Sequence, residues 1–261
     1  MNVKIRTTAV LALAALALPA AAAVKTKPLE YKQGDTVLQG FLAWDDAAKG
    51  KRPGVLVVHE WWGHNEHARE QAKRLAKAGY VGFALDMYGK GKVATHPEDA
   101  KAFMAEATKD PQTVKARFDA ARALLAEQPQ VDAKEIAAIG YCFGGGVVLR
   151  MAEAGEDLGG VATFHGALPP PPEKDQKVTA RVLIQTGGAD PMVPKDQVQE
   201  FAKAMKDAGA DVQVVTYPGA KHSFTNPNAA KAGMDALAYD KSADEKSWAK
   251  LLEFLKATFK R

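Results

Sequence analysis

The sequence contains one cysteine, Cys142, among its 261 residues. A single thiol cannot form an intrachain disulfide, so the fold does not rest on a disulfide framework. Charge of one sign does not dominate either, because 35 Lys and Arg residues face 31 Asp and Glu residues and leave a net charge of +4. That balance gives no reason to expect a nucleic-acid partner. Internal repeats and long linkers are also lacking, and the length suits one domain with a full core.

The N-terminal segment differs from the rest of the chain. Residues 1–6 carry two basic side chains, residues 9–18 form a short apolar run, and residues 21–23 are three alanines. This pattern predicts a secretory signal peptide over residues 1–23, whose removal would lower the net charge from +4 to +2. The apolar run is short for a membrane span, although an uncleaved anchor is the alternative. We expect an exported protein, periplasmic or secreted, whose domain covers residues 24–261 without stable membrane insertion.

Strand-like and helix-like segments alternate through residues 24–261, which predicts an α/β domain with a parallel sheet. Residues 54–58 form a continuous apolar run, typical of a central strand buried on both faces. Further strands are predicted at 80–85, 135–139, 161–164, 182–186 and 211–217, with an antiparallel strand at 36–44. Helices are predicted at 66–78, 100–107, 113–128, 147–154, 195–208 and 243–259, and a stiff proline-rich loop at 169–172.

The segment Gly-Tyr-Cys-Phe-Gly-Gly-Gly at residues 140–146 lies between a predicted strand and a predicted helix. That context is typical of the nucleophile elbow, which is Gly-x-Ser-x-Gly in most α/β-hydrolases. Here Cys142 replaces the serine, and a helix N-terminus beneath it would favour the reactive thiolate. A lone cysteine is most often a small buried hydrophobic residue, however, so this segment alone leaves the role of Cys142 open.

Two further residues complete the order nucleophile, acid, histidine that this fold uses. Asp190 follows the predicted strand 182–186, and His222 follows the predicted strand 211–217. The carboxyl ends of parallel strands meet at one edge of the sheet, where open α/β sheets place their sites. Each residue alone is more often a turn or surface residue. Three such residues in order at strand ends favour a Cys142–Asp190–His222 catalytic triad.

Five segments together resemble the dienelactone hydrolase family, a cysteine branch of the α/β-hydrolases that includes the carboxymethylenebutenolidases. They are residues 59–63 (His-Glu-Trp-Trp-Gly), 85–89, 140–145, 187–194 and 219–224, and the resemblance extends from Leu29 to the C-terminus. It implies a single-domain α/β-hydrolase fold with a mostly parallel sheet and helices on both faces. It also implies a cofactor-free hydrolase of small esters or lactones, which we expect to be a monomer.

The chemistry of such a triad assigns a role to each residue. Cys142 attacks the carbonyl carbon, His222 acts as general base and later protonates the leaving alkoxide, and Asp190 orients the imidazole. The oxyanion hole of this fold uses the N–H of the residue after the nucleophile, here Phe143, and one N–H from the loop after the third strand, here Trp61. The resemblance further implies that Glu60 lies near the thiol and controls its protonation. A surface carboxylate at a strand end is the alternative for Glu60.

The histidines of residues 59–67 raise the possibility of a metal site. His59 and His64 are five residues apart, and a glycine and two tryptophans interrupt any helix between them, unlike the zinc-protease motif. His64 and His67 could share a helix face but lack an evident third ligand. We therefore expect no metal. The aromatic residues near the predicted strand ends are expected to line an apolar pocket, or alternatively to be plain core: Trp61, Trp62, Tyr88, Phe164, His165 and Phe224.

The sequence departs from the family at two positions that concern the substrate. Where the family holds a substrate carboxylate with two arginines, this chain has Lys90 and Asn226. Lys90 lacks the bidentate fork of arginine, and Asn226 lacks the charge. We therefore expect weak activity on dienelactone and a different small ester or lactone as substrate. A general esterase or acyl-transfer enzyme with the same triad, and a catalytically inert binding protein on a hydrolase scaffold, are the alternatives.

Overall fold

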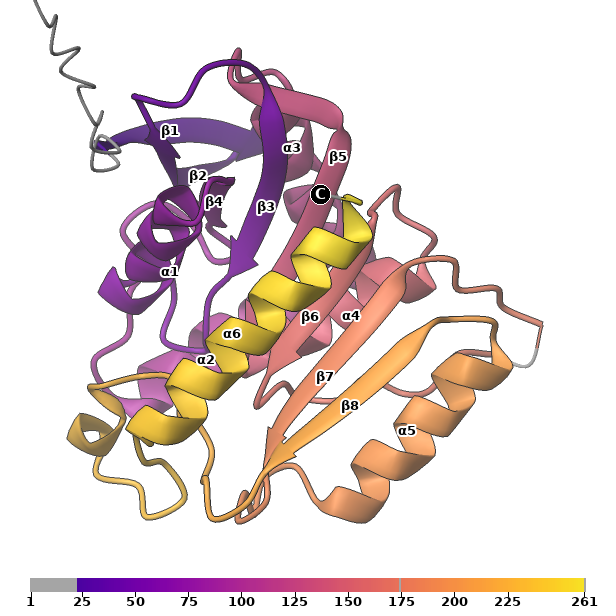
Figure 1. Ribbon diagram of the computed structural model, residues 1–261. Coiled ribbons are helices and arrows are strands. Elements are labelled where there is room, and N and C mark those ends of the chain that lie inside the picture. Colours follow the sequence, from indigo (N-terminus) through magenta and orange to yellow (C-terminus); the bar gives the residue numbers. More distant parts are fainter. Residues whose placement is uncertain (1–22, 174, 261) are drawn as a thin grey trace, which may run out of the picture.

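An eight-stranded sheet organises residues 23–173 and 175–260, which are the residues that the computed structural model describes. Its strand order is β1-β2-β4-β3-β5-β6-β7-β8 (Figure 1). The strands are β1 (Val24–Gln33), β2 (Thr36–Asp45), β3 (Arg52–Val58), β4 (Val81–Leu85), β5 (Val131–Tyr141), β6 (Gly160–Phe164), β7 (Arg181–Gly187) and β8 (Val212–Tyr217). β1 and β2 run antiparallel to their neighbours, and all other neighbouring strands are parallel. The predicted signal peptide lies outside the described residues, except for its last residue.

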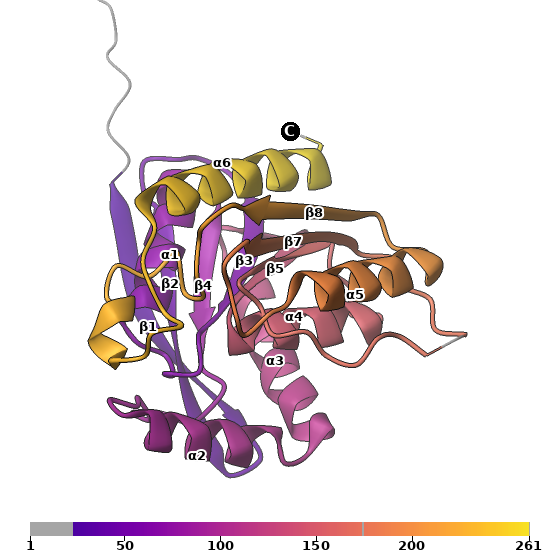
Figure 2. The ribbon, with the colours of Figure 1, turned by 90° about the horizontal axis from the view of Figure 1, so that it is seen from below.

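Helices cover both faces of the sheet (Figure 2). α1 (Glu66–Lys77) and α6 (Lys241–Thr258) lie on one face, where they share an apolar cluster with β3, β5 and β6. α3 (Pro111–Ala126), α4 (Phe143–Glu153) and α5 (Lys195–Asp207) lie on the other face, with α2 (Pro97–Thr108) beside α3. A short 3-10 helix, η1 (Ala229–Ala232), precedes α6. None of the helices in the described residues is long and apolar enough to cross a membrane.

The central strands are apolar for the reason that the sequence predicts. All seven residues of β3 and all five of β4 are buried, because helices cover both faces of these strands. α1 presents its alanines and Leu75 to the sheet and its charged residues to solvent. The predicted fold class, a mostly parallel sheet with helices on both faces, is therefore confirmed.

The first strand, β1, is the main element that the sequence prediction missed. β1 pairs with β2 over ten residues through a tight turn at Gly34, whose φ is +55°. Tyr31 is its one buried side chain, because the strand lies at the edge of the sheet and most of its other residues are charged or polar. The exposed sequence Val-Lys-Thr-Lys-Pro therefore lacks the apolar alternation of a half-buried strand. Other predicted elements are present with shifted ends; α4 begins at Phe143, four residues before the predicted start.

The parallel strands bring their carboxyl ends to one edge of the sheet. The arrowheads of β3, β6, β7 and β8 point to the same lower side in Figure 1. Residues that follow these strands therefore come together although they are far apart in sequence. Glu60 follows β3, Cys142 follows β5, His165 follows β6, Asp190 follows β7 and His222 follows β8.

Candidate active site

Cys142 lies between β5 and α4 with a strained backbone. Its φ is 51° and its ψ is −115°, a combination that non-glycine residues rarely adopt. Its N–H donates to the carbonyl of Phe164 at the end of β6, and its own carbonyl accepts from Gly145 and Ala167. These bonds hold Cys142 from the neighbouring strand and from the first turn of α4. The side chain is almost fully buried, with 9% of the residue exposed.

The flanking glycines are required because other chain segments approach the turn closely. A Cβ at Gly140 would lie 2.0 Å from the carbonyl oxygen of Gly144. A Cβ at Gly144 would lie 2.4 Å from the carbonyl oxygen of Val58, at the end of β3. Neither backbone atom can move aside as a flexible side chain would. The Gly-x-Cys-x-Gly pattern is thus the set of residues that lets the elbow pack against β3.

Asp190 and His222 form a buried pair. The Nδ1 atom of His222 lies 2.8 Å from Oδ2 of Asp190, and both side chains are almost inaccessible to solvent. The backbone N–H of Met192 donates to Oδ1 of Asp190 at 2.8 Å and fixes the carboxylate. The loops that carry the pair are also joined, because the N–H of Ala189 donates to the carbonyl of Ala220. An Nδ1–H that donates to Asp190 leaves Nε2 of His222 for exchange with a reacting group.

The thiol and the carboxylate together determine the charge of His222. Burial lowers the pKa of His222, but attraction to the Cys142 thiolate and the hydrogen bond to Asp190 outweigh it and raise the pKa to about 10. No described nitrogen or oxygen pairs with Nε2 of His222, so this atom is free to bond to the sulfur. A proton that leaves the thiol is therefore retained on the imidazole at neutral pH.

The two predicted oxyanion donors are free in the described part of the chain. No described acceptor takes a hydrogen bond from the N–H of Phe143 or of Trp61. Phe143 is the first residue of α4, so its amide also carries the partial positive charge of the helix N-terminus. The carbonyl of Trp61 accepts from the hydroxyl of Tyr88 at 3.0 Å, which fixes the peptide beside the predicted donor.

Glu60 is buried, with 2% of the residue exposed, rather than on the surface. Ser223 donates to its Oε1 through the hydroxyl, and Asn226 donates to its Oε2 through the side-chain amide, each at 2.7 Å. His67 lies 3.7 Å from Oε2 through its Nδ1. The carboxylate thus joins the end of β3 to the loop that carries His222. No hydrogen bond links it directly to Cys142 among the described residues.

Sequence reasoning gave no role to Ser223 or His67. Ser223 follows His222 and has a φ of +55°, and its hydroxyl donates to Glu60. His67 and Gln71 are buried polar residues four positions apart on α1, hence neighbours on one helix face. Buried polar residues at that spacing within an alanine-rich helix are the signal that could have revealed them.

Several residues predicted for the substrate pocket lie elsewhere. Phe164, His165 and Phe224 are inaccessible to solvent, or nearly so, and form part of the core. The His165 ring lies edge-on to His222 with centroids 5.0 Å apart, and Phe224 packs against His165 from another side. All three side chains are thus core residues, which is the alternative that the sequence left open, and they offer no surface to a substrate.

Lys90, the charged residue of the predicted substrate pocket, forms an ion pair with a residue of β1. The ammonium of Lys90 lies 2.5 Å from Oε1 of Glu30, a residue of β1, and both side chains are about half exposed. The sequence does not indicate this pair, because β1 lacks the alternating pattern of a half-buried strand. Asn226 is committed to Glu60, as described above. Lys90 is therefore not an unpaired cation for a substrate carboxylate.

The remaining pocket residues lie near the end of β3. Trp61 and Trp62 are partly exposed and pack edge to face, with ring centroids 5.0 Å apart. Tyr88 is buried, and its ring contacts Phe143 and His59. Trp62 and Asn226 line a small cavity of about 190 Å³. No group of three or more His, Cys, Asp or Glu residues in the described ranges is arranged to hold a metal ion.

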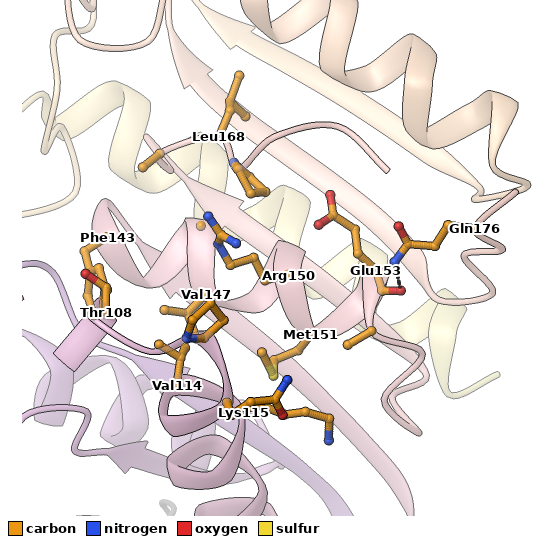
Figure 3. Close-up of a pocket in the computed structure, with 16 residues that line it drawn as sticks. Thr108, Val114, Lys115, Phe143, Val147, Arg150, Met151, Glu153, Leu168 and Gln176 are labelled. Atoms are coloured by element: carbon orange, nitrogen blue, oxygen red, sulfur yellow. Dashed lines mark hydrogen bonds between the residues drawn. The ribbon is translucent and has the colours of Figure 1, made fainter. Parts of the chain in front are cut away.

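A larger cavity of about 430 Å³ lies along the outer side of α4. Phe143, Val147 and Arg150 follow one another along this helix and line the cavity, with Leu168 opposite (Figure 3). Cys142 and His222 are not among its lining residues, so the cavity adjoins the elbow through Phe143 alone. At its far end burial raises the pKa of Glu153 to about 7, although the positive charge of Arg150 opposes the shift.

Comparison with known proteins settles the family. The sequence model of the Dienelactone hydrolase family matches residues 38–259, most of the chain. This chain belongs to that family. Membership in this family makes it a carboxylic ester hydrolase with the dienelactone hydrolase-like α/β-hydrolase fold.

Individual relatives agree with this assignment. Protein usf of Aquifex pyrophilus is 30% identical over 203 residues, which cover 76% of this chain and 86% of that protein. A solved dienelactone hydrolase-like promiscuous phosphotriesterase from metagenomic libraries is 34% identical, with a TM-score of 0.86 over 90% of this chain and 99% of that chain. A solved structure named m3DLH is 38% identical, with a TM-score of 0.85 and the same coverage of both chains.

Proposed function

We propose that this dienelactone hydrolase-like enzyme cleaves small esters or lactones through a Cys142–His222–Asp190 triad and an acyl-thioester intermediate. The observation that carries the proposal is that Cys142, Asp190 and His222, which follow three different strands, come together at one edge of the sheet. Cys142 lies on a strained elbow, and Asp190 lies 2.8 Å from Nδ1 of His222. Attraction to the thiolate outweighs the effect of burial and raises the pKa of His222 to about 10. This arrangement supports an ion pair between thiolate and imidazolium before substrate binds.

Each step then follows from the positions of the atoms. The sulfur of Cys142 attacks the carbonyl carbon, and the N–H groups of Phe143 and Trp61 receive the developing oxyanion. The tetrahedral intermediate collapses as the alkoxide leaves with the proton from Nε2 of His222, and a thioester remains on the sulfur. Neutral His222 then removes a proton from water as the water oxygen attacks the thioester carbon. The C–S bond breaks, which releases the acid and leaves the sulfur beside His222, which holds the proton taken from water.

The substrate is best described as a neutral ester or lactone. Lys90 is paired with Glu30, and Asn226 is bound to Glu60, so neither position offers a free cation to a carboxylate. The cavity along α4 begins at Phe143 and is wide enough to take an apolar substituent of the substrate. Leu168→Trp, at the opposite wall, would then raise KM for esters with a bulky arm more than for acetate esters.

The test compares wild type with Cys142→Ala on p-nitrophenyl esters, simple lactones, dienelactone and a phosphotriester. The phosphotriester is included because one relative is named for that activity. We expect turnover of at least one ester or lactone, weak turnover of dienelactone and loss of activity in Cys142→Ala. Turnover retained in Cys142→Ala would show that Cys142 is not the nucleophile. An accumulating thioester that amines release faster than water would favour acyl transfer, and no turnover on any substrate would favour an inert binding protein.

Export is a separate part of the proposal. The basic, apolar and small-residue pattern of residues 1–23 supports a cleaved signal peptide and a periplasmic or secreted enzyme. Expression in a Gram-negative host, followed by fractionation and intact-mass measurement, tests it. A mature chain that begins near residue 24 in the periplasmic fraction is expected; full-length protein in the cytoplasm would contradict it.

A further inference from the structure

His67 is a buried histidine that the triad does not use. It lies on the inner face of α1, and its ring packs edge-on against Tyr141 of β5 with centroids 5.0 Å apart. Its two nitrogens face different partners. Nδ1 lies 3.7 Å from Oε2 of Glu60, whereas Nε2 lies 3.2 Å from Nε2 of Gln71 and 3.3 Å from the carbonyl oxygen of Thr225.

The orientation of Gln71 decides which nitrogen of His67 carries the proton. Arg74 donates to Oε1 of Gln71 at 3.1 Å, and because a guanidinium only donates, the amide oxygen must face Arg74. The NH₂ group of Gln71 therefore faces His67 as a donor. Arg74 is itself fixed, because it pairs with Asp244 at 2.9 Å and stacks on Trp248. A donor held at Nε2 requires a lone pair there and so places the proton on Nδ1.

The other neighbours of His67 agree with this assignment. A buried carboxylate is a stronger acceptor than a peptide carbonyl, so Glu60 competes for the imidazole proton better than Thr225 does. His67 thus faces Glu60 through Nδ1–H.

We propose that His67 is a positioning residue for Glu60, held as the Nδ1–H tautomer by Gln71 and Arg74. The inference rests on the proposed function in one respect, namely that Glu60 influences the Cys142 thiol. Ser223 and Asn226 donate hydrogen bonds to the carboxylate, and His67 faces it through Nδ1 at 3.7 Å, so the three groups hold Glu60 against the loop that carries His222.

A cavity of about 300 Å³ borders His67. Thr225 and Asn226 line it as well, so it extends to the loop that follows His222. The charged and titratable groups that face His67 or this cavity are Glu60, Glu66, Glu70, Arg74, Asp244 and His165, with the Tyr141 ring beside the imidazole. Glu60 is the acid among them that lies within 4 Å of the His67 ring.

The first test reads the tautomer directly and needs no substrate. Long-range ¹H–¹⁵N correlation spectra of the whole ¹⁵N-labelled protein at pH 7 resolve the imidazoles, and His67→Phe identifies the His67 signal by its loss. We expect a protonated Nδ1 and an unprotonated Nε2. Gln71→Met should convert His67 to the Nε2–H tautomer, because Thr225 is then the partner of Nε2. An Nε2–H tautomer or an imidazolium in wild type would overturn the proposal.

The second test follows Cys142 through its rate of alkylation by iodoacetamide between pH 4 and 9. We expect the acidic limb of this profile to move up by about half to one pH unit in His67→Phe and in Gln71→Met, the size expected for losing a contact weaker than a full hydrogen bond to a charged group. His64→Gln is the matched control, because His64 is a buried histidine of the same segment, and it should leave the profile unchanged. Unchanged profiles in both test variants would refute the positioning role.

The two experiments separate this inference from the proposed function. Tautomer and alkylation are measured without ester turnover, so an enzyme that fails on every ester would count against the proposed function alone. If His67→Phe does not fold, Gln71→Met and the wild-type spectrum still decide the proposal. A pH profile that shifts in His64→Gln as much as in Gln71→Met would mark a general loss of packing and would also refute it.

Discussion

Two buried carboxylates, Asp190 and Glu60, each face a histidine at the same edge of the sheet. Asp190 lies 2.8 Å from His222, whose other nitrogen is free to bond to the Cys142 thiol. Glu60 lies 3.7 Å from His67, whose other nitrogen faces the neutral amide of Gln71. The two pairs therefore differ in the group that faces the other nitrogen of the histidine. A thiol can exchange a proton with its histidine, whereas an amide can only determine which nitrogen of its histidine carries the proton.

The largest effect is expected from breaking the first pair with Asp190→Asn. The amide would donate to Nδ1 and impose the wrong tautomer on His222, so kcat should fall by about 10³- to 10⁴-fold with little change in fold. Steady-state kinetics on the best ester of the panel measure the loss. Asp196→Asn, an exposed substitution on α5, is the control. A loss of less than tenfold in Asp190→Asn would show that Asp190 does not orient the base.

Glu60→Gln breaks the second pair. It should lower activity less than Asp190→Asn does and should change mainly the pH dependence. The substitution keeps the shape but removes the charge that Ser223, Asn226 and His67 surround, so we expect kcat/KM to fall by about tenfold and the pH profile of acylation to change. Pre-steady-state acylation rates between pH 5 and 9 provide the measurement. Glu66→Gln, which is exposed, is the matched control. A pH profile identical to wild type would contradict a role for Glu60 at the thiol.

A third carboxylate, Glu153, sharpens the comparison because it has no histidine. One of its oxygens is buried without a hydrogen-bond partner, and burial raises its pKa from 4.5 to about 7. A raised carboxyl pKa in the folded state means that stability is lost as the pH rises from about 4.5 to about 7. Because Glu153 is partly exposed, Glu153→Gln should gain only about 1 kcal/mol at pH 8, or about 2–4 °C in Tm, and nothing at pH 4. Equal Tm differences at pH 4 and pH 8 would contradict this account.

The same contrast explains how much the sequence could predict. The apolar run at β3 and the glycines around Cys142 carry strong local signals, because burial on both faces and close backbone contact each permit few residue types. Asp190 and His222 follow such strands and were predicted from their order. The second pair depends on His67 of α1, held by Gln71, and Ser223 after β8 meeting Glu60 after β3, which no local pattern encodes.

The pairing of Lys90 with Glu30 could not be predicted for a related reason. Its partner Glu30 belongs to an edge strand whose charged, proline-containing sequence lacks the alternation of a buried strand. The aromatic residues after β6 and β8 were ambiguous in a different way. Phe164 and Phe224 follow the pattern of pocket residues and of core residues equally well, and only their burial in the folded chain assigns them to the core.

Detection of the acyl-enzyme tests the central claim most directly. Wild-type protein mixed with a p-nitrophenyl ester is quenched in acid within milliseconds, digested and analysed by mass spectrometry. We predict that the peptide containing Cys142 gains the mass of the acyl group, that hydroxylamine removes it, and that Asp190→Asn slows its formation. An acyl group on any other residue, or turnover with no adduct on Cys142 in either variant, would contradict the thioester mechanism.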